Sequence, residues 1–311
     1  MSGYDVVVLG DANPDLIVRG QDVVPAFGQA ERLVDEAVLT IGGSGAIFAC
    51  AAARLGLGVA FVGVVGDDRF GHYMVEELTA NGVDTAAIVI DGGRPTGLTV
   101  VLSMPSDRAM LTAPGTTGAL RLDRIDRGVL ARARHVHVSS YYLQGGLAPD
   151  LPRLFEELRR AGTTTSVDPN WDPSGRWDEA LPRLLPSVDV FLPNEMEALS
   201  LARTSELARA IAVFREAGAG VVAVKRDGQG AIGADASGIV RVDGLEATVV
   251  DGTGAGDAFD AGFLACWLAG EPLPRALAVG NACGASAVGG AGGTASLATM
   301  DQALERVGVP G

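Results

Sequence analysis

Short apolar runs alternate with helical patterns along most of the chain, and this alternation constrains the fold more than any other feature of the sequence. Runs such as Val6–Leu9 have the length and β-branched content of buried strands. Strands are predicted at 6–9, 59–65, 135–139, 164–168, 188–192 and 220–225, and helices at 45–55, 69–81, 150–161, 195–202, 205–217, 257–269 and 273–288. This order favours an α/β fold of three α/β/α layers, Rossmann-like, with a mostly parallel central sheet.

Two stretches, about 15–40 and 86–112, break the alternation with strand-like patterns and few helical signals. We expect them to form a small β-sheet that projects from the main body and covers a ligand as a lid. The sequence contains no internal repeat and no long linker. Residues 1–311 are therefore predicted to form a single domain that carries a lid.

Composition narrows the class of protein. A formal net charge of −14 argues against a nucleic-acid binder, which usually has a basic face. Three widely spaced cysteines predict reduced, buried thiols. The almost uncharged stretch 42–66 is interrupted by Arg54 and by glycines, so it predicts a helix and a buried strand and no membrane partner. Residues 1–5 lack a basic leader segment, and we expect a cytoplasmic protein.

The segment 251–263, which reads DGTGAGDAFDAGF, carries the clearest chemical signal. Its glycines let backbone N–H groups approach a ligand closely, and the N-terminus of the following helix favours an anion such as phosphate. Asp257 stands at the edge of this segment, where it can act as a base. Neither a Walker loop nor a dinucleotide fingerprint fits the spacing. The pattern predicts phosphoryl transfer to an alcohol, although similar turns often serve packing alone.

Polar residues and glycines also follow the first strand. Asn13 and Asp15 offer groups suited to sugar hydroxyls, and an Asx-rich turn explains them equally well. Gly42, Gly43 and Ser44 open the helix at 45–55, where backbone N–H groups can face a hydroxyl-rich ligand. Tight packing of a helix on a strand is an equally good explanation of these glycines.

Further candidates follow later strands. Asp168 and Asn170 end the strand at 164–168. Asn194 and Glu197 have the spacing of a helix capping box, and their oxygens also suit Mg²⁺. Lys225 begins a turn that also contains Gly228 and Gly230, and it either meets a phosphate or carries a solvated charge. His135 and His137 alternate on a strand without an evident third metal ligand, which favours a structural role.

Taken together, these motifs resemble those of the PfkB-type (ribokinase-like) carbohydrate kinases. The segment 251–257 is similar to the family signature Asp-Thr-x-Gly-Ala-Gly-Asp, and 42–47 to its N-terminal Gly-Gly-x-Gly-Ala-Asn. The pair Asn194 and Glu197 matches Asn-x-x-Glu, and 224–230 is similar to Val-Lys-x-Gly-x-x-Gly. The resemblance extends from Asp11 to Ser296 and implies a ribokinase-like fold.

The resemblance also implies roles for single residues. It makes Asp257 the general base, with the backbone of Gly254, Ala255 and Gly256 as an anion hole, and it assigns the acceptor to Asn13, Asp15, Gly42, Gly43, Ser44 and Asp257. It assigns ATP to Asp168, Asn170, Asn194, Glu197, Lys225, Gly228, Gly230 and Asn281, with Mg²⁺ held near Glu197 through water. It places a monovalent cation such as K⁺ at Asp251, Thr253, Gly292 and Ser296.

The chain departs from the family pattern at three positions. Gly252 replaces Thr, Ile47 replaces Asn, and Asp172 stands where fructokinase-like relatives have Arg. Ile47 cannot form a polar contact, and Asp172 would repel a phosphate, although Arg176 lies nearby in the sequence. These departures leave the sugar undetermined.

We therefore predict an ATP-dependent kinase that phosphorylates a hydroxyl of a sugar or sugar-like alcohol. A nucleoside is the alternative acceptor, since a patch formed by Ile47 and Phe48 would suit a base. A nicotinamide-dependent dehydrogenase and a catalytically silent sugar-binding regulator are the other classes considered. Lid-to-lid dimers occur in the resembled family, so a homodimer through the lid is also expected.

Overall fold

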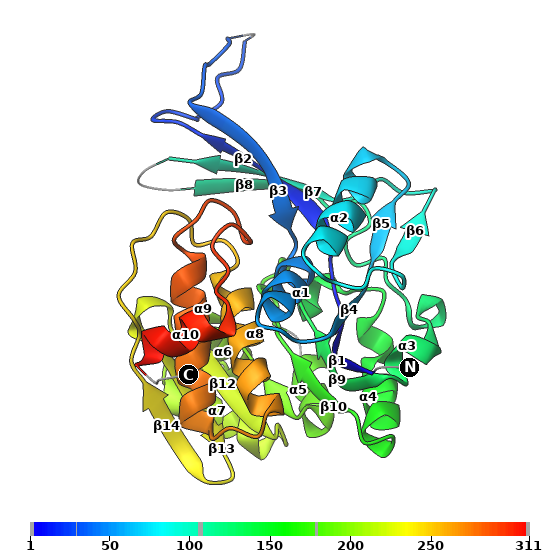
Figure 1. Cartoon of the computed structure of the whole chain (residues 1–311), viewed down its shortest axis with the longest axis vertical. Helices are drawn as coiled ribbons and strands as arrows, with labels where there is room; N and C mark the ends of the chain where they lie inside the picture. Colours follow the sequence, from blue (N-terminus) through cyan, green and yellow to red (C-terminus); the bar gives the residue numbers. More distant parts are fainter. Residues whose placement is uncertain (1–2, 29, 105–107, 178–179, 309–311) are drawn as a thin grey trace.

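An eight-stranded sheet forms the centre of the computed structural model, which describes residues 3–28, 30–104, 108–177 and 180–308 (Figure 1). From one edge to the other its strands are β14 (Gly238–Val242), β13 (Ala231–Asp235), β12 (Val221–Lys225), β11 (Val190–Phe191), β10 (Thr164–Val167), β9 (Ala133–Val138), β1 (Tyr4–Leu9) and β4 (Val59–Val62). The strands from β12 to β4 pair in parallel, and β13 and β14 add an antiparallel edge. The mostly parallel sheet is thus confirmed.

Helices cover both faces of this sheet, and the side chains of β1 show why. Val6 and Val8 point into one apolar core, and Val7 and Leu9 point into the other, because successive side chains of a strand alternate. Helices α1 (Ser44–Arg54), α2 (Arg69–Ala80), α8 (Ala255–Leu268), α9 (Leu273–Ala287) and α10 (Met300–Val307) contribute to the first core. Helices α3 (Arg127–Leu130), α4 (Leu151–Arg160), α5 (Ala180–Leu184), α6 (Glu195–Ala202) and α7 (Leu207–Glu216) contribute to the second. The predicted three-layer α/β/α fold is correct.

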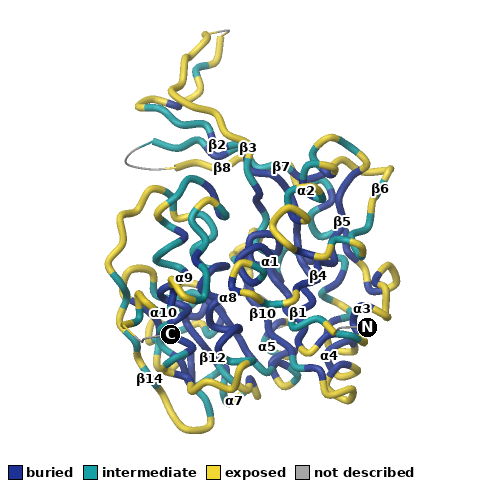
Figure 2. Tube along the Cα trace, in the orientation of Figure 1, coloured by how far each residue is buried: buried dark blue, intermediate teal, exposed yellow. Residues whose placement is uncertain are grey.

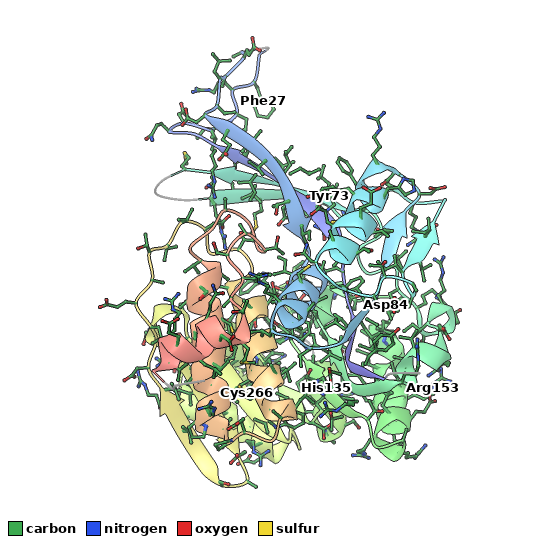
Figure 3. The ribbon with its side chains drawn as sticks, viewed as in Figure 1. Phe27, Tyr73, Asp84, His135, Arg153 and Cys266 are labelled. Carbon is green, nitrogen blue, oxygen red and sulfur yellow. The ribbon has the colours of Figure 1, made fainter. Side chains whose placement is uncertain are left out.

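A separate four-stranded sheet projects from this body and forms the lid (Figure 1). Its order is β3 (Glu36–Gly42), β2 (Asn13–Arg19), β7 (Leu98–Ser103) and β8 (Arg108–Ala113). Figure 2 shows that the lid is mostly exposed while the sheet beneath it is buried. Phe27, in the loop between β2 and β3 at the far end of the lid, is 98% exposed (Figure 3).

The secondary structure differs from the expectation in a few places. The stretch 86–112 divides, because β6 (Val89–Asp91) pairs with β5 (Val64–Gly66) in a small sheet of its own and only the part from Leu98 onward joins the lid. The hairpin β13–β14 and helix α10 were not predicted. α10 is only eight residues long, and besides Ala303 its apolar residues are only partly buried.

The stretch 42–66 forms α1, β4 and β5, as its charge and glycines indicated. Of the helices in the described part of the chain, none is long and apolar enough to cross a membrane. Cys50, Cys266 and Cys283 are buried free thiols, which confirms the expectation of reduced cysteines.

Helix α1 packs directly on the turn that follows β1. A Cβ atom placed on Gly45 would lie 2.9 Å from the Gly10 Cα and 3.0 Å from the Asp11 backbone nitrogen. The backbone N–H groups of Gly45 and Ala46 donate to the Asp11 carboxylate and carbonyl, at 3.2 and 3.1 Å. The glycine therefore allows the close backbone contact that fixes the start of β2 and the site residues on it.

The variant Gly45→Ala tests this contact. We expect it to lower the free energy of unfolding by about 1–3 kcal/mol, because the added methyl group overpacks a backbone contact. Urea unfolding measures the change, with Gly92→Ala as the matched control, since a Cβ at Gly92 meets nothing within 4 Å. Equal stability of the two variants would contradict the account.

Candidate active site

A cavity of about 710 Å³ opens where the parallel strands of the central sheet end. Its volume lies in the range of small-molecule sites, and its position is where open α/β sheets bind ligands. Twelve of the predicted site residues line it: Ser44, Asp168, Asn170, Asn194, Glu197, Lys225, Gly228, Gly230, Ala255, Gly256, Asp257 and Asn281. Their separation in the sequence makes this convergence the main evidence for a site.

Asp257 lies in the first turn of α8, within the glycine-rich segment. Gly254 is the N-cap residue and adopts φ 76°, a left-handed conformation that favours glycine. Ala255 and Gly256 follow it into the cavity wall, where the first N–H groups of a helix lack intrahelical acceptors. Burial raises the pKa of Asp257 well above its usual value; the Asp168 carboxylate adds to the rise, while Lys225 opposes it.

Gly254 itself takes a structural role. A Cβ placed on it would lie 2.7 Å from the Gly293 Cα and 2.9 Å from the Ile47 Cγ2. The residue therefore packs against the loop after α9, and the cavity-facing part of the predicted anion hole consists of Ala255 and Gly256.

Lys225 ends β12 and is held by two buried carboxylates. Its Nζ donates to Asp168 Oδ2 at 2.9 Å and to both carboxylate oxygens of Asp260 at 3.0 Å. Although burial opposes it, these two acids raise the pKa of Lys225. Burial alone would raise the pKa of Asp168, but the Lys225 ammonium outweighs burial, so the pKa of Asp168 lies below its usual value. For Asp260 burial dominates and the pKa is raised well above its usual value.

Lys225 is therefore a buried structural cation at the floor of the cavity, and the alternative of a solvated turn charge is wrong. A Cβ on Gly256 would lie 3.7 Å from Nζ, so the ammonium group approaches the backbone at the start of α8. Sequence reasoning missed Asp260 as a site residue. Its place three residues after Asp257 was the available signal, because residues three apart share a helix face.

Asn194 and Glu197 form the capping box that their spacing predicted. The Asn194 Oδ1 accepts from the Glu197 N–H at 2.9 Å, and the Glu197 Oε2 accepts from the Asn194 N–H at 2.8 Å. Burial, with Asp168 next in effect, raises the pKa of Glu197 to about 7. The other carboxylate oxygen, Oε1, is the kind of ligand that Mg²⁺ prefers.

Magnesium commonly binds through one or two carboxylates, several waters and phosphate oxygens. Among the described residues, no group of three or more His, Cys, Asp or Glu side chains is arranged to hold a metal ion. The carboxylates that line the cavity therefore fit a magnesium ion that arrives with a nucleotide, rather than a resident metal held by protein alone.

The far end of the cavity has small and apolar walls that suit a flat base. Gly228, Gly230, Gly244 and Gly284 line it together with Leu245, Val249, Ala285 and Val288. Asn281 on α9 donates to the Val242 and Asp243 carbonyls at 3.3 and 3.1 Å, and so connects this wall to β14. The size and lining of this cavity are those expected of a nucleotide site.

The predicted acceptor residues form a second group beneath the lid. A Cβ on Gly42 would lie 2.1 Å from Asp15 Oδ1, and one on Gly43 would lie 3.1 Å from Asn13 Oδ1. The Asn13 Nδ2 is 3.5 Å from Asp15 Oδ1 and from Thr99 Oγ1. Burial, followed by the Asp11 charge, raises the pKa of Asp15 to about 7.

Ser44 and Asn170 connect this group to Asp257. The Ser44 hydroxyl lowers the pKa of Asp257, although burial outweighs this effect. The Asn170 Nδ2 donates to Ser140 Oγ at 3.0 Å and lies 3.5 Å from Ser44 Oγ. Asn170 has φ 54°, a conformation that asparagine tolerates better than most residues. The two groups of predicted residues therefore meet at Asp257.

Asp251, Thr253 and Gly292 form a third group where the loop before α8 meets the loop after α9, whereas Ser296 lies beside Gly290 in the latter loop. Asp251 Oδ1 accepts from the Thr253 N–H at 2.9 Å and hydroxyl at 2.8 Å, and Oδ2 accepts from the Gly292 N–H at 3.0 Å. Burial alone would raise the pKa of Asp251, but these hydrogen bonds and Arg108 lower it.

The departures from the family pattern have structural explanations. Ile47 is 3% exposed and packs against Gly254 and Gly293, and Phe48 is fully buried and stacks on His137. The expected base-binding patch of Ile47 and Phe48 is therefore wrong. Asp172 accepts from the backbone of Ser174 and Trp177 at 2.8 and 2.7 Å, so it stabilises its own turn.

Arg176 contacts Ser174 in that same turn. His135 and His137 share the Ser166 hydroxyl at 2.7 and 2.8 Å, which explains them structurally. Figure 3 places His135 in the body of the molecule. Burial lowers the pKa of His137 to about 3, so the ring is neutral.

Comparison with known proteins identifies the family of this chain. The sequence model of one family, described as pfkB family carbohydrate kinase, matches residues 4–300. An ATP-dependent ribose-1-phosphate kinase of Halopiger xanaduensis is 31% identical over 287 residues, which cover 91% of this chain and 92% of the relative. A fructoselysine 6-kinase of Shigella flexneri is 33% identical over 252 residues, which cover 79% of this chain and 89% of the relative. A solved E. coli protein named ribokinase II, in complex with ATP and Mg²⁺, has a TM-score of 0.86 at 27% identity and covers 99% of each chain.

The buried ion pairs of Lys225 predict a large loss of stability in Lys225→Met. The variant leaves Asp168 and Asp260 buried without their cation, which typically costs about 3–5 kcal/mol. Arg127→Met is the control, because Arg127 pairs with Glu157 at the surface, where their side chains are 50% and 43% exposed, and should lose at most about 1 kcal/mol. Urea unfolding measures both, and equal losses would show that the buried pairs do not hold the site together.

Proposed function

The chain belongs to the pfkB family of carbohydrate kinases and is a sugar kinase; on that premise we propose that it phosphorylates a hydroxyl of a sugar or sugar-like acceptor with Asp257 as general base. The observation that carries this proposal is the position of Asp257. It lines the nucleotide-sized cavity together with Ser44, the residue that directly follows the predicted acceptor residues Gly42 and Gly43.

Asp257 would take the proton of the attacking hydroxyl. A general base works best when its pKa approaches the operating pH, and burial moves the pKa of Asp257 in that direction. Lys225 limits the rise and favours the charged form that accepts a proton. The Asn13 and Asp15 side chains would orient the acceptor by hydrogen bonds to its other hydroxyls.

The start of α8 would stabilise the charge that develops during transfer. Bound ATP supplies the phosphoryl group, and Mg²⁺ near Glu197 neutralises part of its charge. Ala255 and Gly256 line the cavity, so their backbone N–H groups would serve as donors, with the Lys225 ammonium close to Gly256. One such donor contributes roughly 3 kcal/mol to transition-state stability.

The relatives favour a sugar over a nucleoside as acceptor. The named activities of two relatives are phosphorylation of ribose 1-phosphate and of fructoselysine. The base-binding patch that would have supported a nucleoside is instead part of the core. A dehydrogenase is not supported, because the family match and the relatives are kinases.

Asp257→Asn tests the base assignment. We expect kcat to fall by about 10²–10⁴-fold with a modest change in the KM for ATP, because the amide cannot accept the proton. Steady-state ADP release in the presence of acceptor measures it. Asp227→Asn is the control, since Asp227 lines the same cavity and its φ of 48° is one that asparagine accepts. Near-normal turnover of Asp257→Asn would refute the assignment.

We also propose a homodimer through the outer face of the lid. Cross-strand register places Leu39, Leu16, Val100 and Leu111 in one row on that face, and Ala37, Val18, Leu102 and Ala109 in the next. Leu39 is 37% exposed and Leu111 is 62% exposed. Such an apolar sheet face is typical of an interface, and a second copy presents the same complementary surface.

Sedimentation velocity tests the dimer. We expect the wild type to sediment as a dimer and Leu111→Glu to sediment as a monomer, because the new charge would be buried in the interface. Thr112→Glu is the matched control, since Thr112 follows Leu111 on β8 and points to the opposite face. A monomeric wild type would contradict the proposal.

A further inference from the structure

The inner face of the lid carries a row of charged and polar side chains directly over the loop that begins α8. Cross-strand register places Glu36, Arg19, Ser103 and Arg108 in that row, one from each lid strand. Paired residues of neighbouring strands share a face of the sheet. The two arginines of this row therefore project to the same side as Asp15, which has the same parity on β2 as Arg19.

Both arginines reach Asp251. The Arg108 Nη1 lies 3.4 Å from Asp251 Oδ1 and donates to Thr253 Oγ1 at 3.1 Å. The Arg19 Nη2 lies 3.6 Å from Asp251 Oδ2. The side chain of Asp251 is only 8% exposed, whereas that of Arg108 is 43% exposed. The lid thus places two positive charges against a nearly buried carboxylate, and Arg108 also lines the main cavity.

These contacts bear on the monovalent cation that the family resemblance implies at Asp251, Thr253, Gly292 and Ser296. A potassium ion in a protein replaces its hydration shell with several oxygen atoms. Here each oxygen of the Asp251 carboxylate accepts a backbone N–H and faces a guanidinium group. Thr253 Oγ1 donates to the carboxylate and accepts from Arg108. The side-chain oxygens of Asp251 and Thr253 do not fit K⁺, because donors engage them and the two guanidinium groups, which carry the same charge as the ion, would repel it.

We infer that Arg19 and Arg108 supply the positive charge at this loop in place of a monovalent cation, so that the kinase works without potassium. Guanidinium groups suit the role because they stay charged and donate in a fixed planar geometry. The Arg108 charge lies beside Gly252 and Thr253, which precede Ala255 and Gly256, the two residues of the proposed anion hole that line the cavity. The inference rests on the proposed kinase function, since it concerns the anion hole of that reaction.

Arg19 and Arg108 belong to lid strands, so the positive charge at Asp251 depends on the position of the lid. Arg19 belongs to β2, the same strand that carries Asn13 and Asp15, whereas Arg108 begins β8 at the opposite edge. A lid that moves away from α8 would remove the acceptor residues and the two cations together. An anion hole completed only in this position would favour transfer to the acceptor over transfer to water.

The test compares the wild type with Arg19→Gln/Arg108→Gln in the full-length protein. ADP release is measured from zero to about 200 mM KCl, with tetramethylammonium chloride, which has no hydroxyl group, added to hold the ionic strength constant. We expect a flat response of the wild type. Without KCl the double variant should turn over at least about tenfold more slowly, the effect of losing one charge-assisted hydrogen bond, and KCl should restore part of the loss. Arg32→Gln is the control, because Arg32 pairs with Asp22 near the far end of the lid.

Three results would overturn the inference. Activation of the wild type by KCl would show that a cation still binds. A double variant as active as the wild type would show that the arginines are not needed. A double variant whose slow ADP release does not change with KCl would show that Arg19 and Arg108 do not replace a cation.

Thermal unfolding of the same proteins separates this inference from the proposed function. The double variant should melt at a lower temperature than the wild type in tetramethylammonium chloride and regain stability in KCl, whether or not an acceptor has been found. The wild type should melt at the same temperature in both salts. If no acceptor supports ADP release while this pattern appears, the kinase proposal fails and the charge substitution stands.

Discussion

A lysine held between two buried carboxylates is the interaction on which the site depends. Lys225 ends β12, Asp168 follows β10 and Asp260 lies in the second turn of α8. The ion pairs therefore fix the end of the central sheet against the helix that carries the anion-binding segment. Because removal of one partner would leave buried charge unpaired, the three residues hold their relative positions strongly.

This fixed charge also determines how the neighbouring acids behave. Asp257 is buried close to Asp168, and both burial and that neighbour raise its pKa. Lys225 opposes the rise and places an ammonium group behind the backbone of Gly256. The same cation thus favours an ionised base and an electropositive floor for phosphate. The lid adds its own cations at Asp251, so the anion-binding segment has positive charge on both sides.

The sequence predicted what local patterns encode. The spacing of apolar residues and the length of apolar runs predicted the three layers and most helix and strand positions. The glycine-rich segment pointed to Asp257 as a candidate base. The capping box of Asn194 and Glu197 followed from spacing alone. The role of Lys225 could not be read in this way, because its partners lie 57 and 35 residues away in the sequence. The sequence did not predict a role for Arg19 and Arg108 for the same reason, because only the register of the lid strands brings them to Asp251.

Two departures from the family pattern also needed the structure. Ile47 and Asp172 seemed to alter the ligand site, yet Ile47 fills space beside two glycines and Asp172 stabilises its own turn. Residues that differ from a motif therefore need not differ in what the site binds. We propose that the acceptor depends instead on the polar group around Asn13 and Asp15, which belong to the lid strand β2.

The central claim is that this cavity transfers a phosphoryl group from ATP to an alcohol. The most direct measurement is ADP release from Mg-ATP across a panel of ribose, fructose, other ketoses, keto-deoxy sugar acids and nucleosides, read against the release with water alone. The account predicts that at least one sugar or sugar derivative raises ADP release well above that background. Binding of Mg-ATP without stimulation by any member of the panel would contradict it.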